Sequence, residues 1–543
     1  MEKRVILAFV LSFVVLYAFS ALYMRRPVSE GPVRSEQAPS ASTANAGVVK
    51  TETPAADSQR AFVPPTEVIR SEKAEELPFD APLYTATFSN VGGVLKSFRL
   101  KQYSDGSGRP LELINQEAGN KQGWPLVLAT ADKAIDEQLR EARFAGRRGP
   151  NGLVLEFASD GLYVKKELRF DAENYVFALE TRLTKDGKEI PHAVVWQGSF
   201  GDQSIPQDPA KRHAVYQSDA AYKRIALQSL KDPQNVTSMR AGVEDQYFAA
   251  MFLSAADAVA VKISKEEYAG PDGKPTPILV LSTAAAEGKG LRLYVGPKQQ
   301  EWLAKADPQL SAVQDYGFWE FIAKPLVFCL LWIHSYIGNF GWSIILLTIG
   351  VNLILFPLRL KQQVSMLKMQ KIQPHMRRLQ DQYKKMKAND PRRTEIQAEM
   401  MGLYKEHGVN PMGGCLPLLL QMPLLLGFYS ALAYSIELRR APWILWIKDL
   451  SQPDPYYVIP ILMAVTMILQ QKLTPTANVD PAQARMMMLM PLVMTFMFLL
   501  VSSGLALYWF TGSLVGVGQQ IFINRYWSPR AEASLKARST REA

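Results

Sequence analysis

At 543 residues the chain is too long for one ordinary compact domain, so two or more units are expected. Its 61 Lys and Arg against 51 Asp and Glu give a net charge of +10, which suits an anionic partner such as a membrane surface or nucleic acid without choosing between them. The only two cysteines, Cys329 and Cys415, both lie in apolar runs, which excludes a disulfide framework or a cysteine metal cluster and favours buried, inert thiols.

The first hydrophobic segment covers residues 5–23, an uncharged run of 19 residues. At about 1.5 Å per residue, a helix of this length approaches the roughly 30 Å hydrocarbon core of a bilayer. A cleaved signal peptide is the alternative, because Ala18 and Ser20 resemble a small-residue cleavage site. Since two arginines follow the run directly, we expect a retained transmembrane anchor over residues 1–26.

The next two segments differ in pattern. Residues 27–77 are rich in Pro, Ser, Ala, Thr and Glu and lack a hydrophobic period, which predicts a disordered linker. Over residues 78–297, stretches such as "GLYVKKELRF" and "NYVFALETRL" alternate with a period of two, which predicts an all-β sandwich domain. His192 and His213 are isolated in this domain, and the sequence contains no HExxH, GxSxG or phosphate-binding glycine loop.

The C-terminal part is dominated by hydrophobic runs. Residues 298–340 contain an apolar stretch interrupted by Glu320, Lys324 and Pro325, which predicts an amphipathic helix region in the membrane interface. Four uncharged runs follow, at 341–358, 413–436, 456–471 and 486–524. The last run has 39 residues, about 58 Å as one helix, so we expect two helices that turn near Ser502 to Gly504. With the anchor, this gives six transmembrane helices, five of them in a core over residues 341–525.

The charges of the loops predict the orientation. Between Arg359 and His407 there are 12 basic and 5 acidic residues, a net charge of +7, whereas residues 437–455 contain three of each sign. The positive-inside rule therefore places the first loop in the cytoplasm and the second outside. Both termini, including a basic tail at 526–543, are then cytoplasmic, and the β domain lies outside.

The predicted core spans contain no Asp, Glu, Lys, Arg or His. Proton-coupled transporters and intramembrane metalloproteases usually keep such groups at membrane depth, so both classes are disfavoured. The absence of a P-loop disfavours nucleotide hydrolysis, and a serine hydrolase built on Ser502, Ser503 or Ser513 would lack a histidine or lysine nearby in the sequence. We expect no catalytic residue, metal or cofactor. A small-solute transporter and a membrane-tethered periplasmic protein that binds or modifies carbohydrate remain alternatives.

Uncharged polar residues are nevertheless present in these spans. Thr348 and Asn352 are four residues apart and share one helix face, and Gln421 lies between Pro417 and Pro423, which free backbone carbonyls. Hydrogen bonds between helices, worth about 0.6 kcal/mol each, would explain any one such residue. Together they favour a helix surface that lines a hydrated cavity.

The cytoplasmic loop carries its own pattern. Apolar residues recur at spacings of three and four, which predicts an antiparallel helical hairpin over about 362–407. Its basic outer faces either solvate the hairpin and set its topology or attract anionic lipid or ribosomal RNA. The hairpin residues expected to make contacts are Met369, Met376, Arg377, Arg378, Met386 and Met400.

Three stretches in order, "NPMGGCLPLLLQMPLLLGFY", "SIELRRAPWILWIKDLSQPDPYYVIPILMAVTM" and "SGLALYWFTGSLVGVGQQIFI", closely resemble the YidC-type membrane protein insertases, relatives of the Oxa and Albino proteins. The resemblance covers about residues 318–525, and "VEDQYFAAMF" more weakly resembles the periplasmic domain of the Gram-negative form. It implies an α-helical polytopic membrane protein with a five-helix core and an all-β periplasmic sandwich domain related to sugar-binding folds.

The resemblance also implies a function. Such a protein inserts and chaperones nascent membrane proteins in the bacterial inner membrane through a hydrophilic groove open to cytoplasm and lipid, alone or with the Sec translocon. The hairpin would receive the substrate, and the hairpin and basic tail would contact the ribosome, whereas no nucleotide or DNA is implied as a partner. The expected groove residues are Thr348, Asn352, Gln421, Met422, Pro423, Met463, Met467, Ser503, Tyr508 and Trp509.

Two positions depart from the family pattern. Members commonly carry an arginine or lysine five residues before the Pro-Leu of the first core helix, and here that position, counted from Pro357, is Asn352. Arg359, about two turns nearer the cytoplasm, is our candidate to replace this cation. The family often has proline where this chain has Ser502, which affects only the expected turn geometry.

Overall fold

The structure is a computed structural model. It describes residues 67–205, 209–219, 221–254, 257–270, 273–285, 290–386, 390–406, 416–473 and 481–527. The predicted anchor, most of the predicted linker, Cys415 and the basic tail beyond Trp527 lie outside the described residues. The chain divides into two units, and the larger one, Phe62–Asn478 with Met490–Ala543, contains both the strands and most of the described C-terminal helices.

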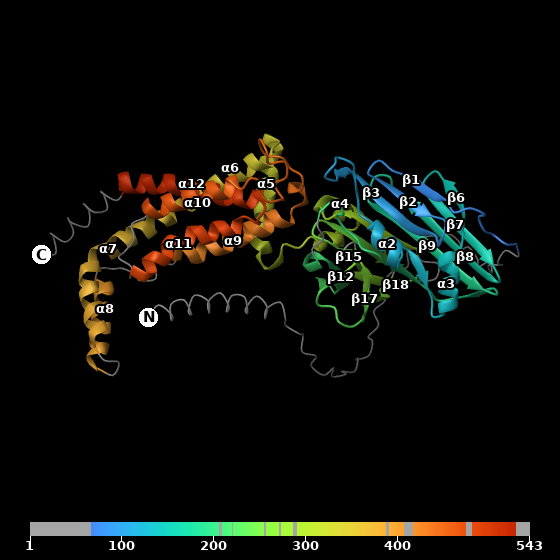
Figure 1. The fold of residues 1–543 in the computed structure, drawn as a ribbon, viewed down its shortest axis with the longest axis horizontal. Helices are drawn as coiled ribbons and strands as arrows, with labels where there is room; N and C mark the ends of the chain where they lie inside the picture. The colour runs from blue at the N-terminus through green and yellow to red at the C-terminus, as the bar shows by residue number, and fades with distance from the viewer. Residues whose placement is uncertain are drawn as a thin grey trace, which may run out of the picture. The chain divides into compact units, whose positions relative to one another are not determined.

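The β-rich region contains three antiparallel sheets (Figure 1). The first sheet has the order β1 (Glu76–Asp80), β2 (Tyr84–Ser89), β3 (Val94–Ser104) and β4 (Pro110–Glu112). The second follows β13 (Ala221–Ala226), β12 (His213–Ser218), β15 (Arg240–Glu244), β16 (Phe248–Ser254), β19 (Leu291–Pro297), β9 (Val176–Lys185), β8 (Leu162–Phe170), β7 (Gly152–Ser159) and β6 (Ala145–Gly149), with β10 (Lys188–Glu189) beside β9. The third has the order β14 (Gln234–Ser238), β17 (Val259–Ala269), β18 (Pro275–Ala284), β11 (Ala193–Trp196) and β5 (Val127–Ala129).

The alternation in the sequence has the expected structural cause. Along β7 and β8, buried and less buried residues largely alternate, because successive side chains of a strand point to opposite faces. Side chains from all three sheets, such as Phe88, Phe177 and Leu281, meet in one hydrophobic core. The predicted β-rich domain is confirmed, and its first strand begins at Glu76. Three short helices, α2 (Gln116–Gln122), α3 (Lys133–Glu141) and the 3-10 turn η1 (Pro209–Lys211), connect strands.

One buried cation holds part of this domain together. The Lys166 ammonium on β8 donates hydrogen bonds to the carbonyl oxygens of Gly92 at 3.0 Å, Gly93 at 2.9 Å and Leu126 at 2.8 Å. Burial lowers the pKa of Lys166 to about 7, whereas the three carbonyls favour the charged form and oppose this fall. The ammonium therefore joins the turn between β2 and β3 to the segment before β5.

A connecting segment leads from the strands to the helices. It comprises α4 (Gln300–Ala306), the 3-10 helices η2 (Pro308–Val313) and η3 (Gly317–Trp319), and α5 (Glu320–Ile337). Ion pairs fasten it to the second sheet: Arg240 pairs with Asp307 at 2.6 Å, and Arg224 pairs with Asp315 at 2.8 Å. The β-rich region is thus joined to the helices by more than its covalent connection.

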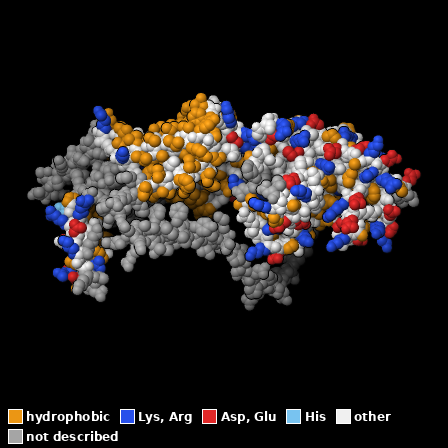
Figure 2. Space-filling view, in the orientation of Figure 1, with side chains coloured by type: hydrophobic (Ala, Val, Ile, Leu, Met, Phe, Trp, Pro, Cys, Tyr) orange, Lys and Arg blue, Asp and Glu red, His pale blue; other side chains and the backbone are white. Residues whose placement is uncertain are grey.

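The helices of the C-terminal part match most of the predicted runs. They are α6 (Phe340–Ile354), α7 (Phe356–Lys385), α8 (Arg392–Glu406), α9 (Leu416–Tyr434), the 3-10 turn η5 (Ile436–Leu438), α10 (Val458–Leu473), α11 (Pro481–Phe498), α12 (Ser503–Phe522) and the π turn η6 (Ile523–Trp527). The break between α11 and α12 confirms the predicted helix pair. Figure 2 shows mostly hydrophobic side chains on the surface of the helical bundle, many charged side chains on the α7–α8 hairpin, and mixed charges on the strands.

The lengths of the helices qualify the predicted spans. Among the described residues, the segment Gly317–Ile337 is the only single helix long and apolar enough to cross a membrane. Phe340–Ile354 and Phe356–Gln363 pass together as a pair bent by 49°. The predicted run 341–358 therefore does not form one straight helix: α6 ends at Ile354, and α7 begins with Pro357 in its first turn, where a missing N–H is tolerated. The number of six spans and the interfacial position of α5 stay predictions.

The predicted hairpin is present as two packed helices, α7 and α8. Ile372 and Met376 of α7 are buried, and Met369, Met400 and Leu403 pack against them. Arg377 and Arg378 are exposed, as expected for the outer face, and Met386 is half-buried just after α7. Met369, Met376 and Met400 thus lie where the two helices pack together. However, α7 begins at Phe356, before the predicted boundary at 362, because the helix is unbroken from there to Lys385.

Candidate functional site

Polar side chains from distant parts of the sequence converge on α12. The first two belong to α6: the Thr348 hydroxyl donates to the Ile344 carbonyl at 2.6 Å, and the Asn352 amide donates to the Thr348 carbonyl at 2.8 Å. Both side chains are buried and bonded to the backbone of their own helix. Their orientation on one face of α6 confirms the relation expected from their spacing, because residues four apart lie one above the other.

Arg359 extends this polar surface toward α12. Its Nη1 donates to Oε1 of Gln519 at 2.7 Å, and Nε2 of Gln519 donates to the Asn352 carbonyl at 3.1 Å. The guanidinium of α7 is thereby connected through one glutamine to the turn of α6 that contains Asn352. We call Thr348, Asn352, Arg359 and Gln519 the polar seam.

Two glycines of α12 make room for the seam. A Cβ atom at Gly512 would lie 3.8 Å from Thr348 Cγ2, and one at Gly516 would lie 3.3 Å from Arg359 Nη1 and 2.6 Å from Gln470 Nε2. Glycine in a packed membrane helix lets neighbouring helices approach closely. Here it lets polar side chains of α6, α7 and α10 reach the same face of α12.

Farther along the same face of α12 is a more apolar site. Tyr508 is buried, stacks on Phe428 with ring centroids 4.0 Å apart, and has the polar side chain of Gln421 beside it. The side chain of Met463 on α10 is buried in the same helical core, while Met467 packs against that core. Gln421 thus faces the interior of the bundle, although it lies in an otherwise hydrophobic helix.

The remaining predicted groove residues are distributed differently. Trp509 is half-buried against Phe498, with ring centroids 5.1 Å apart, and Pro423 is half-buried inside α9. Met422 is 38% exposed on the surface of the bundle, outside the polar seam. Ser503 also lies away from the seam, because it begins α12 at the opposite end and its hydroxyl donates to the Gln452 carbonyl at 2.7 Å.

Two glutamines were missed in the sequence. Gln519 links Arg359 to α6, and Gln363, one turn after Arg359 on α7, is 6% exposed with an amide Nε2 that has no hydrogen-bond partner among the described residues. The four-residue spacing from Arg359 to Gln363 was the available signal. It was obscured because residue 363 was assigned to the cytoplasmic hairpin.

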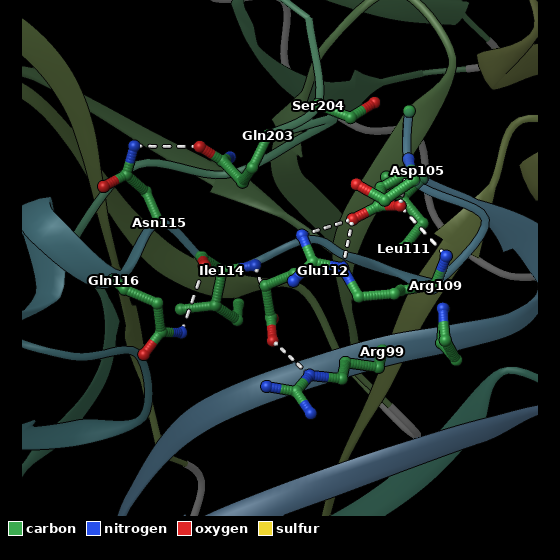
Figure 3. A pocket seen from close by; sticks show the side chains of 13 residues that line it. Arg99, Asp105, Arg109, Leu111, Glu112, Ile114, Asn115, Gln116, Gln203 and Ser204 are labelled. Atoms are coloured by element: carbon green, nitrogen blue, oxygen red, sulfur yellow. Dashed lines mark hydrogen bonds and ion pairs between the residues drawn. The ribbon is translucent and has the colours of Figure 1, made fainter.

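The β-rich region contains a polar pocket of about 770 Å³ (Figure 3). The side chains around it satisfy one another: Asn115 donates to Gln203 at 2.8 Å, Arg99 pairs with Glu112 at 3.2 Å, and the lining residue Arg109 pairs with an aspartate at 2.9 Å. The charged side chains of this lining are thus paired with one another. Within the described part of the chain, no three side chains of His, Cys, Asp or Glu gather as a metal site.

The two histidines of this region do not form a catalytic pair. His192 is 2.8 Å from the Thr181 hydroxyl, while His213 lies 3.8 Å from Glu244 on another strand. Burial lowers the pKa of both imidazoles, which favours their neutral forms. The expectation that each is isolated agrees with these separate surroundings.

Comparison with known proteins identifies the family. The sequence model of a family described as 60Kd inner membrane protein matches residues 332–530, and that of the YidC periplasmic domain matches residues 76–329. A Geotalea daltonii protein named membrane protein insertase YidC is 34% identical over 552 residues, with 97% of this chain and 99% of the relative covered. The protein of that name from Oleidesulfovibrio alaskensis is 36% identical over 553 residues, with 96% and 99% covered.

A solved structure described as an active YidC insertase with its first transmembrane domain resolved is 21% identical. The match covers 84% of this chain and 94% of that chain with a TM-score of 0.36. The assignment rests instead on the sequence relatives, which align with both the β-rich region and the helices over nearly their full lengths. This chain therefore belongs to the YidC family of membrane protein insertases.

Proposed function

We propose that this chain inserts and chaperones nascent membrane proteins in the bacterial inner membrane through a hydrophilic groove open to the cytoplasm and to lipid. The observation that supports the groove most directly is the partly buried hydrogen-bonded connection from Arg359 through Gln519 to Asn352. A polar segment that crosses a bilayer unaided loses its hydration at a large cost in free energy. Donors and acceptors of the polar seam would replace part of that hydration.

The proposed reaction involves no covalent chemistry. The YidC insertases are not enzymes, and the driving force would come from burial of the client's apolar segment in the bilayer. The client's polar outer segment would enter along α12, while its hydrophobic segment would leave past the lipid-facing helices. Tyr508 and Gln421 would contact it beyond the polar seam, because they occupy the same side of the bundle.

Arg359 is the proposed substitute for the cation that the family usually has at position 352. In support, its guanidinium is held toward α6 by Gln519, and its remaining N–H groups can bind a carboxylate. Arg359→Ala should reduce insertion of clients with acidic tails about tenfold or more and spare neutral tails. Lys361→Ala, an exposed cation two residues away, is the matched control. An equal loss for both classes of tail would contradict a role in charge recognition.

The proposed partners follow from the family and the charge distribution. We propose insertion of small clients alone and of larger clients with the Sec translocon, in a six-span topology with both termini in the cytoplasm. The exposed Arg377 and Arg378 on the α7–α8 hairpin would contact the ribosome together with the basic tail. Their replacement by glutamate should weaken ribosome cosedimentation, and an unchanged association would argue against this contact.

The principal experiment uses the purified protein in sealed liposomes without nucleotide. A small single-span client should become protected from external protease to a greater extent than in protein-free liposomes. Protection would support autonomous insertion, and Asn352→Arg would then be compared for a shift toward clients with acidic tails. No protection for several clients of different tail charge, together with solute flux in the absence of any client, would instead favour a transporter.

A further inference from the structure

A short segment after α9 is fastened to the β-rich region. Arg439 donates from Nε to Oδ2 of Asp202 at 2.5 Å, from Nη2 to the Ser204 hydroxyl at 3.1 Å and from Nη1 to the Ser104 carbonyl at 3.1 Å. Its guanidinium also lies 5.8 Å from the ring centre of Phe248. The side chains of Arg439 and Asp202 are only 4% and 1% exposed, so this ion pair is shielded from water.

The β-rich region is organised to receive this arginine. The backbone N–H of Asp202 donates to Oδ2 of Asp245 at 2.7 Å, and Oδ1 of Asp245 accepts the N–H groups of Tyr247 and Phe248 at 2.8 and 2.6 Å. Gly201 has φ +119°, and a Cβ there would come within 2.3 Å of the Asp245 carboxylate. The loop with Asp202 is therefore fixed by contacts within its own region, which orients the carboxylate toward Arg439.

Apolar packing accompanies the ion pair. Ile436 is 2% exposed and belongs to the hydrophobic core formed by the strands, although it follows α9 in the sequence. Gln246 adds a hydrogen bond from its Nε2 to the carbonyl oxygen of Ala433 at 2.6 Å. Burial of Ile436 stabilises the contact between the two regions through the hydrophobic effect. The buried ion pair mainly fixes the geometry of this contact, because desolvation offsets much of its electrostatic attraction.

We infer that residues 433–440 form an outer latch through which the β-rich region braces the end of α9. Ile436 supplies the apolar anchor, and Arg439 with Asp202 sets the register. The latch restrains the helix that carries Gln421, the residue beside Tyr508. It gives the β-rich region a mechanical role that requires no ligand. The inference rests on these contacts and holds whichever clients the protein inserts.

The test is hydrogen–deuterium exchange on the full chain in lipid nanodiscs without client. Arg439→Ala should increase exchange at least about tenfold both in residues 433–440 and in the distant loop 201–204, because an unpaired buried aspartate destabilises both sides. Asp202→Asn should increase exchange in the same two segments. The double variant should exchange little faster than either single variant, since both changes remove the same ion pair. Arg440→Ala is the graded comparison and should give a clearly smaller increase, because Arg440 contributes only one long contact to the latch, from its Nη2 to the Ser204 hydroxyl at 3.4 Å.

Exchange in β7, β8 and α8 reports whether each variant has folded and should remain unchanged. Arg439→Lys is a milder variant that keeps the charge but lacks the planar guanidinium, whose three nitrogens reach three separate acceptors, so it should give a smaller increase in the same two segments. An increase confined to 433–440, or an Arg440→Ala effect as large as that of Arg439→Ala, would overturn the latch. Because exchange is read without client, this failure would leave the proposed insertion activity unaffected.

Discussion

Glu437 lies in the outer latch with one carboxylate oxygen buried and no hydrogen-bond partner for it among the described residues. Burial raises the pKa of this carboxyl above its usual value of 4.5. The folded state therefore holds the proton to a higher pH than the unfolded state, so its contribution to stability is full below pH 4.5 and is lost as pH rises toward the folded pKa. Glu437→Gln should stabilise the protein by about 1 kcal/mol at pH 7.5, because it removes the buried charge.

The pH dependence provides the check on Glu437. Chemical denaturation at several pH values should show the advantage of Glu437→Gln shrinking as pH falls toward 4.5. Glu399→Gln, at an exposed position of α8, should show no comparable effect. A stabilisation that is constant over the whole pH range would mean that desolvation of the carboxylate is not its cause.

For Lys166, we predict that the free energy of unfolding changes with pH in the direction opposite to that for Glu437. Because its pKa falls from 10.5 to about 7 on folding, the unfolded state binds more protons between these values. The free energy of unfolding should therefore rise with pH through this window, and this component should disappear in Lys166→Met. The variant should also be less stable at pH 10.5, since even the neutral amine can donate to two of the three carbonyls that surround it. Parallel pH profiles for the two proteins would refute the assignment.

At the scale of helices, close packing of α9 on α5 gives a steric prediction. A Cβ atom at Gly427 would lie 2.5 Å from Cγ2 and 2.9 Å from Cβ of Ile322. Gly427→Ala should therefore destabilise the helical core by about 1–3 kcal/mol, because the two helices must separate or shift. Gly518→Ala on α12 is the matched control, since no atom lies within 4 Å of its added Cβ. The measurement is thermal unfolding in detergent. If Gly518→Ala unfolded at a lower temperature than Gly427→Ala, the packing argument would be wrong.

Helix boundaries show which local features could be read in advance. The pair α11 and α12 was predictable because 39 uncharged residues exceed one bilayer crossing. By contrast, the bend between α6 and α7 was missed, since hydrophobicity continues through Pro357 and marks no boundary there. Met422 was assigned to the groove from its neighbours, whereas its exposure depends on how α9 rotates against α5 and α12. Tertiary packing decides that rotation.

At the scale of the whole molecule, the helices should insert clients without the β-rich region, but their stability should depend on it. A variant lacking residues 78–297 should retain most insertion activity, because the proposed groove residues all lie in the helices. Its helical core should nevertheless unfold at a lower temperature, since Ile436 and Arg439 lose their partners in the strands. Protease protection and thermal unfolding on the same sample measure both. Complete loss of insertion in a folded core would place an essential step in the β-rich region.

The sequence by itself determined the composition and order of the parts: alternating strands, apolar helices, a methionine-rich hairpin, and Thr348 and Asn352 on one helix face. These follow from interactions within a few residues, whose periods of 2 and 3.6 are visible in the chain. Only the tertiary structure decided that Arg359 meets Gln519, 160 residues away, and that Ile436 enters the core of the strands. Such contacts depend on which faces pack together, and no local period encodes that choice.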